Sequence, residues 1–182
     1  NPNDPKLMVT DERIKLGSVL PDYNAGFRND FSYKGINLSL LFSARFGGIV
    51  VSPTQGFLDG LGVSKASADA RDAGGVSINN GRIDAQHYYE TVGLGQLLSH
   101  YTYSATNVRL QEMSIGYTFP KKWMGDRVKL TASLVGRNLW MIYCKAPFDP
   151  ELTASTGSYL QGIDYFMQPS LRSLGFNVQL KF

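Results

Sequence analysis

The sequence of 182 residues predicts an all-β fold, namely five antiparallel strands of a membrane-spanning β-barrel. Three observations support this prediction. Large apolar residues alternate with small or polar ones over five segments, aromatic residues collect at the segment ends, and the connections are alternately short and long. Alternation with a period of two is typical of strands whose two faces meet different surroundings. In a membrane barrel those surroundings are lipid on one face and a polar interior on the other.

The first four strands are predicted from their apolar rows. The first strand lies within 25–34, and the second covers 35–46 after a tight turn. The third covers 107–119, where the parity of the apolar row changes near 111–112. Such a change predicts one extra residue in the strand, which is a β-bulge. The fourth strand begins with the apolar row of 128–134.

The last ten residues predict the fifth strand. From Ser173 to Phe182 every even position is large and apolar, and every odd position is small or polar. This length matches the roughly 9 to 11 residues with which a tilted strand crosses a bilayer. The pattern fits a plain lipid-facing strand, and equally a signal for barrel insertion that acts through strand pairing. The residues of this assembly signal are Gly175, Phe176, Val178, Leu180 and Phe182.

The connections distinguish a membrane barrel from a soluble β-sandwich, whose strands also alternate. About 60 residues separate the second and third strands and about 30 the fourth and fifth, whereas the other connections are short. In an antiparallel series all long connections then lie on one side, as in outer-membrane barrels with short periplasmic turns. The aromatic residues at the strand ends resemble the interfacial girdles of such barrels. They are Tyr33, Phe46, Tyr117, Phe119, Trp123, Trp140 and Phe182.

Composition excludes several classes of function. The net charge is +3 and no basic run is longer than Lys121-Lys122, so nucleic acid is not an expected partner. Cys144 is the only cysteine and the two histidines are not at ligand spacing, so neither a metal nor another cofactor is expected. No catalytic triad or phosphate-binding glycine loop is present, and the sequence does not predict an enzyme or catalytic residues.

Five strands are too few to close a barrel, because bacterial barrels begin at about eight strands. We therefore expect the first and last strands to pair with strands outside this sequence, from a longer chain or from other copies. The polar segment 1–22 contains no signal peptide, which favours further chain upstream. An oligomeric outer-membrane adhesin or porin and a soluble, extracellular sugar-binding sandwich are the alternatives.

Five segments resemble the late barrel of SusC-type TonB-dependent transporters. In chain order they are Pro21–Phe27, Ala105–Pro120, Val135–Trp140, Ala146–Glu151 and Arg172–Phe182, and they keep the order and spacing of that family. The resemblance covers the chain from about residue 10 to its end and is weakest over 50–100.

The resemblance implies a 22-stranded barrel with an N-terminal plug domain inside it. Residues 1–182 would be the C-terminal part of the barrel, and the signal peptide, plug and remaining strands would lie outside this sequence. It also implies import of oligosaccharides or peptides across the bacterial outer membrane, under a SusD-like surface lipoprotein that acts as a lid. Energy would come from the TonB complex through parts absent from this chain. Nothing in the loops distinguishes one glycan from another, or a glycan from a peptide.

Two groups of side chains are candidates for function. Aromatic rings stack on sugars and anchor interfaces, and carboxylates bind hydroxyls or calcium. Residues of these types in or beside the long connections are predicted to contact substrate or lid, with packing within the loops as the alternative. They are Tyr101, Tyr103, Trp140, Asp149, Glu151, Tyr159, Asp164 and Tyr165. Charged residues of the polar strand faces are predicted to line the lumen, and these are Arg28, Asp30, Arg45 and Lys129.

Overall fold

The computed structural model describes residues 12–78, 80–124, 128–151 and 160–181. The chain divides into two compact units. The loop unit consists of residues 1–19, 49–104 and 151–168, and the sheet unit consists of residues 20–48, 105–150 and 169–182.

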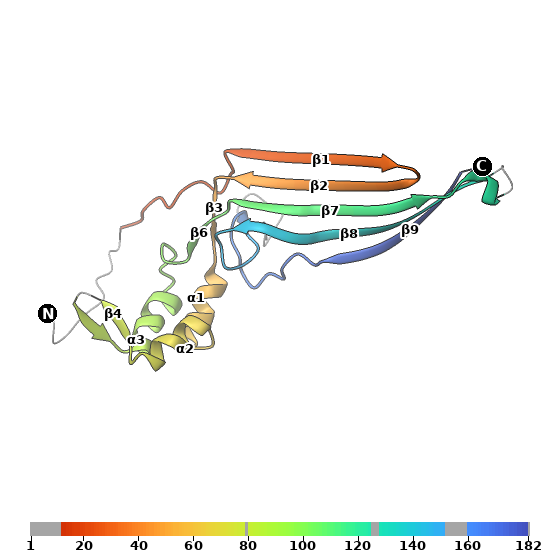
Figure 1. Ribbon diagram of the computed structural model, residues 1–182. Coiled ribbons are helices and arrows are strands. Elements are labelled where there is room, and N and C mark those ends of the chain that lie inside the picture. The colour runs from red at the N-terminus through yellow and green to blue at the C-terminus, as the bar shows by residue number, and fades with distance from the viewer. Residues whose placement is uncertain (1–11, 79, 125–127, 152–159, 182) are drawn as a thin grey trace. The chain divides into compact units, whose positions relative to one another are not determined.

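The sheet unit contains one antiparallel sheet in the order β1-β2-β7-β8-β9 (Figure 1). Its strands are β1 (Tyr23–Tyr33), β2 (Ile36–Phe46), β7 (Asn107–Thr118), β8 (Lys129–Cys144) and β9 (Ser173–Lys181). All five predicted strands are confirmed. The fourth continues well beyond its predicted apolar row, because irregular pairing near Asn138 breaks the alternation that would have revealed the rest. Phe182 lies outside the described residues.

The tight turn between β1 and β2 has the geometry that a two-residue hairpin needs. Tyr33 pairs with Ile36, and the two residues between them have φ values of 47° at Lys34 and 89° at Gly35. Positive φ at both positions is the type I′ arrangement, whose twist matches that of the strands. Gly35 has a second constraint, since a Cβ there would lie 2.8 Å from the Thr118 carbonyl oxygen.

The predicted β-bulge is at Gln111. On β2, Leu41 pairs with Glu112 and Phe42 pairs with Leu110, so Gln111 has no partner across the sheet. The extra residue restores the apolar row on both sides of the bulge, as the change of parity predicted. The Gln111 side chain accepts a hydrogen bond from Ser43 Oγ at 2.7 Å.

The loop unit contains short helices that the sequence pattern did not predict. The helices are α1 (Pro53–Gly60), α2 (Lys65–Asp72), α3 (Ala85–Tyr89) and the π-helical turn η1 (Glu90–Leu94). Ser52, Ser64 and Asp84 cap the three α-helices by accepting backbone N–H bonds. Helices of eight residues or fewer depend on tertiary packing, so their own sequence carries a weak signal. None of the described helices is long and apolar enough to cross a membrane.

Short strands complete the loop unit, and a further short helix lies in the sheet unit. The strands are β3 (Ile49–Val51), which pairs with β6 (Thr102–Ser104), and β4 (Val76–Ile78), which pairs with β5 (Gly81–Ile83). The 3-10 helix η2 (Lys121–Met124) follows β7. In the described part of the long connections, no strand reaches membrane length.

Two glycines allow α1 and η1 to pack against each other. A Cβ on Gly93 would lie 2.3 Å from the Gly56 carbonyl oxygen, which is closer than any real contact. Val50, Val92 and Tyr101 are buried in the same unit. This small core fixes the positions of the loop helices relative to one another.

Candidate functional site

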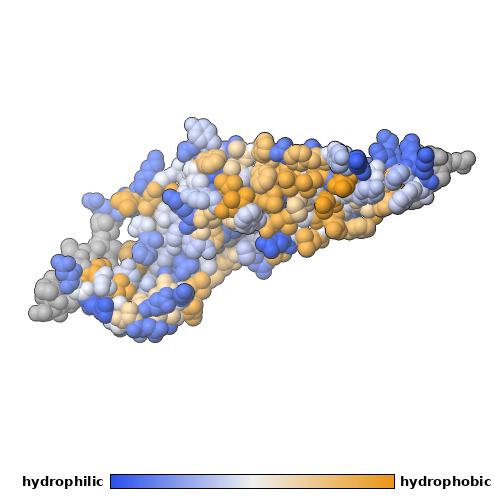
Figure 2. Space-filling model, viewed as in Figure 1, coloured by the Kyte–Doolittle hydropathy of each residue, from blue (hydrophilic) through white to orange (hydrophobic). Residues whose placement is uncertain are grey.

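One face of the sheet unit is apolar from one edge strand to the other. The register places Phe31 beside Leu38, Leu38 beside Ile115, Ile115 beside Leu134, and Leu134 beside Phe176. Figure 2 shows apolar residues gathered over the strands. The side chain of Phe31 is 57% exposed, that of Leu134 61% and that of Phe176 69%, and no second sheet covers this face within the described sheet unit. A soluble sheet buries such a face, so its exposure indicates contact with lipid.

Aromatic residues border the apolar face at the end with the short turns. The rings of Tyr117 and Phe119 are 5.1 Å apart and perpendicular, and Trp123 lies 6.0 Å from Phe119. Tyr33 closes the first strand at the same end. These rings form the girdle that was predicted for a membrane interface.

Aromatic residues also border the end with the long connections. Tyr23 pairs with Phe46, and Trp140 pairs with Leu110 in the apolar row. Between the two girdles β1 spans 11 residues. At about 3.3 Å per residue and a tilt of about 40°, this strand gives a height of roughly 25 Å, the height of the apolar band in outer-membrane barrels. Trp140 therefore lies among girdle residues, as one of its two predicted roles has it, and its second predicted role as a substrate or lid contact stays a prediction.

The opposite face of the sheet is polar. Arg28 and Asp30 lie on it and form an ion pair at 3.0 Å, with both side chains about 60% exposed. Arg45 lies on the same face beside Asn107, and Lys129 lies beside Lys181. The four residues predicted to line the lumen thus share one face of the sheet. Exposed ion pairs contribute little stability, so these charges need another role.

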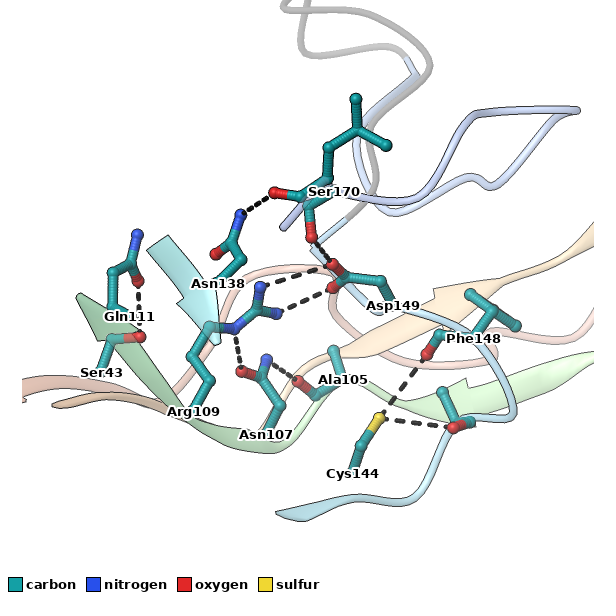
Figure 3. A network of polar contacts seen from close by, with 12 residues as sticks. Ser43, Ala105, Asn107, Arg109, Gln111, Asn138, Cys144, Phe148, Asp149 and Ser170 are labelled. Carbon is teal, nitrogen blue, oxygen red and sulfur yellow. Dashed lines mark hydrogen bonds and ion pairs between the residues drawn. The ribbon is translucent and has the colours of Figure 1, made fainter. Parts of the chain in front are cut away.

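A buried polar network connects β7 to the segments that follow β8 and precede β9 (Figure 3). Arg109 Nη2 donates to Asp149 Oδ1 at 2.8 Å, and Arg109 Nε donates to Asn107 Oδ1 at 3.2 Å. The side chains of Arg109 and Asp149 are 5% and 9% exposed. Ser170 Oγ also donates to the Asp149 carboxylate. The Asp149 carboxylate, predicted to meet substrate or lid, is thus already bound within its own chain.

Further contacts anchor the same connection to the sheet. Asn138 Nδ2 donates to the Leu171 carbonyl oxygen at 3.2 Å. The Cys144 thiol donates to the Ala146 and Phe148 carbonyl oxygens at 3.3 and 3.6 Å. Both ends of the connection between β8 and β9 are therefore bound to strands of the sheet unit.

Two other predicted contact residues are buried in the loop unit. Asp164 is 5% exposed, and its carboxylate accepts a hydrogen bond from Ser52 Oγ at 2.6 Å. Tyr101 is 1% exposed, and burial together with the nearby Asp59 carboxylate raises the pKa of its hydroxyl. Neither side chain is available at the surface, which agrees with the alternative of packing within the loops.

An exposed aromatic group in the described part of the loop unit contains Tyr165, which is 54% exposed, and Phe166, which is 58% exposed. The ring of Tyr165 lies 6.3 Å from that of Phe57 and 5.2 Å from that of Phe166, in edge-to-face geometry. Phe166 has a φ of 53°, and its backbone N–H donates to Thr54 Oγ1 at 2.7 Å. Phe57 and Phe166 were not among the predicted contacts. Phe57 is distant in sequence and joins Tyr165 only in the fold.

The remaining candidates are distributed over the chain. Tyr103 is half-buried in β6, and burial raises the pKa of its hydroxyl. Glu151 is exposed, and Tyr159 lies outside the described residues. The assembly-signal residues Gly175, Phe176, Val178 and Leu180 lie on β9, which is exposed along its whole length and pairs with β8 alone in the described chain.

The exposed apolar face, its two aromatic girdles and the polar opposite face define a segment of a membrane-spanning β-barrel. Comparison with known proteins shows which proteins the chain resembles. The chain is 28% identical over 184 residues to TonB-dependent receptor P3 of Formosa agariphila, an alignment that covers 97% of the chain. It is 24% identical over 199 residues to TonB-dependent receptor P39 of the same organism. The chain spans 18% of the length of each of these relatives.

Among solved structures, the RagAB peptide importer in its open-open state has a similar fold. The TM-score is 0.65 at 22% identity, over 91% of this chain and 18% of that one. No family model matches the sequence. The comparisons confirm the predicted resemblance to SusC-type TonB-dependent transporters and place the chain in the bacterial outer membrane. The relatives are named as receptors and the structural neighbour as an importer, not as enzymes.

Proposed function

We propose that this chain is the C-terminal part of a 22-stranded barrel in a TonB-dependent importer of oligosaccharides or peptides. The importer works with a SusD-like lipoprotein as its lid. The observation that carries the proposal is the five-stranded sheet whose apolar face is exposed between two aromatic girdles. The sequence similarity of the chain to TonB-dependent receptor P3, over 97% of the chain, supports the same function.

The open edges of the sheet support a larger barrel. Within the described chain, β1 and β9 each have one neighbouring strand. In hydrocarbon every unpaired backbone group costs several kcal/mol, so each edge needs a further strand. Relatives more than five times as long as this chain offer enough sequence for those strands and for a plug domain. The polar face with Arg28, Asp30, Arg45 and Lys129 then lines the lumen.

The loop unit then lies outside the cell, because the short turns of such barrels are periplasmic. On it, the exposed cluster of Phe57, Tyr165 and Phe166 is suited to contact the lid or the substrate. Aromatic residues are common anchors of interfaces, and Phe166 is held in an unfavourable backbone conformation by its contact with Thr54. Strand β9, with its regular apolar row, serves as the assembly signal.

Immunoblotting of outer membranes with an antibody to residues 147–165 tests this proposal. A chain of 20.1 kDa that covers 18% of a relative corresponds to a whole protein of about 110 kDa. We expect a band of about that size that changes mobility on heating and co-purifies with a lipoprotein. A soluble 20.1 kDa band would contradict the membrane barrel, and a heat-sensitive multiple of 20.1 kDa would indicate an oligomeric porin or adhesin instead.

A further inference from the structure

The loop unit contains a cavity of about 490 Å³ between its helices. Its wall includes Asp59 at the end of α1, Arg71 of α2, Gln86 and Tyr89 of α3, and Glu90 of η1. The volume lies within the range of roughly 300 to 1,000 Å³ that is common for small-ligand sites. Sequence reasoning did not identify this cavity, because its wall comes from four separate helical segments.

Two carboxylates of the wall are oriented by glutamines four residues earlier in the chain. Gln55 Nε2 donates to Asp59 Oδ1 at 2.8 Å, and Gln86 Nε2 donates to Glu90 Oε1 at 2.8 Å. Residues at this spacing are neighbours on a helix surface. A neutral amide fills one acceptor site of a carboxylate but leaves its negative charge. Both carboxylates are therefore fixed in place without being neutralised.

A cation, Arg71, also lines the cavity, but it keeps its charge and forms no ion pair with either carboxylate in the described chain. Neither Asp59 nor Glu90 forms an ion pair there, and Asp59 is only 4% exposed. The guanidinium of Arg71, which also lines the cavity, donates to the Gly62 carbonyl oxygen at 2.9 Å. A buried carboxylate without a cationic partner is costly, so a positively charged ligand would remove a cost that the loop unit otherwise carries.

The tyrosines around the cavity respond to this negative charge. Burial and then the charge of Asp59 raise the pKa of Tyr88 and Tyr89. For Tyr89, Tyr88 and the exposed Asp69 of α2 add to the effect. Tyr89 is also one of the residues that line the cavity. An aromatic ring beside carboxylates is a favourable environment for an organic cation.

We propose that this cavity binds a primary ammonium group of the imported substrate, with Asp59 and Glu90 as counter-ions and Tyr89 as an aromatic wall. The inference rests on the proposed function and deepens it, because it assigns a substrate class to a loop of the importer. An ammonium group is compact and donates three hydrogen bonds, which suits two carboxylates that each have free acceptor sites. Neutral hydroxyl groups would satisfy those sites but would leave the buried charge uncompensated.

A bare metal ion does not fit the cavity as well. It would fill little of 490 Å³, and no three acidic, histidine or cysteine side chains of the described residues converge as ligands. An ammonium group on a larger molecule uses the volume. It belongs either to a peptide, through lysine or the N-terminus, or to an amino sugar.

The test measures binding to the intact importer, purified in detergent, by isothermal titration calorimetry with two matched pairs of probes. One pair is trilysine and its fully N-acetylated form, and the other is the glucosamine trimer and its N-acetylated form. We expect the amino form of at least one pair to bind at least about tenfold more tightly than its acetylated form. The pair that shows the difference identifies the source of the ammonium group as peptide or amino sugar.

Three variants connect the preference to the cavity. We expect Asp59→Asn to abolish the preference and Asp69→Asn, at an exposed carboxylate outside the cavity wall, to preserve it. Glu90→Gln is a second test at an exposed residue, in case the buried substitution unfolds the loop. Equal binding of the amino and acetylated probes, no detectable binding of either amino probe, or equal behaviour of all three variants would overturn the inference. Heat-dependent mobility and outer-membrane location do not depend on these carboxylates. An unmodified protein that lacks either of these two properties would therefore refute the proposed function instead.

Discussion

The buried ion pair between Arg109 and Asp149 yields the most specific prediction. Asp149→Asn keeps the shape of the side chain but removes its charge, and the guanidinium of Arg109, whose side chain is only 5% exposed, loses the charge of this carboxylate. Loss of one partner of a buried pair costs about 3 to 5 kcal/mol. Because each 1.4 kcal/mol is a factor of ten, local opening at the pair should become more frequent by roughly two to three and a half orders of magnitude.

Hydrogen exchange of the intact importer, resolved by mass spectrometry, measures this effect. Faster exchange is expected in 145–150 and 169–172, the two ends of the connection that the network binds to the sheet. Glu112→Gln is the matched control, because its partner Arg137 is 69% exposed and such pairs contribute only about 0 to 1 kcal/mol. The double variant Arg109→Gln with Asp149→Asn should recover part of the lost protection, since both charges of the buried pair are then removed. If Asp149→Asn raises exchange no more than Glu112→Gln does, the buried pair does not anchor the connection.

Three further predictions test the membrane face, the loop core and the tyrosines. Leu40→Arg, in the middle of the apolar face, should lower barrel stability by about 2 to 4 kcal/mol in lipid, whereas Ser39→Arg on the polar face should have little effect in urea unfolding. Gly93→Ala should loosen the loop unit, because the added Cβ would lie 2.3 Å from a carbonyl oxygen of α1. Limited proteolysis should therefore cleave this variant sooner than the unmodified protein. The control is Gly26→Ala, whose Cβ would have no atom within 4 Å. Burial and Asp59 raise the pKa of Tyr101 in the folded protein, so loop stability should be complete below the ordinary tyrosine pKa of about 10 and fall as pH rises above it. Proteolysis across that pH range checks the decline, which Tyr101→Phe should reduce and which a flat profile in the unmodified protein would contradict.

The sequence by itself determined the strands, the turn and the bulge of the sheet unit. Each of these features depends on residues close together in the chain. Apolar residues alternate because lipid lies on one side of every strand and polar surroundings on the other. The alternation can therefore be recognised in the sequence without any tertiary contact. The change of parity near Gln111 predicted the bulge for the same reason, and Lys34-Gly35 marked the tight turn. Only β8 was underestimated, since its irregular pairing interrupts the alternation.

The tertiary structure alone decided which of the candidate side chains are accessible. Asp149 lies 40 residues from Arg109, and no local pattern shows that the start of β7 meets the start of the connection that follows β8. Tyr101 and Asp164 were indistinguishable from exposed loop residues in the sequence, yet both are buried in the loop unit. The cavity at Asp59 likewise depends on α1 and η1 packing closely at their glycines. Short helices and ion pairs between distant segments take their stability from packing, which a single sequence does not display.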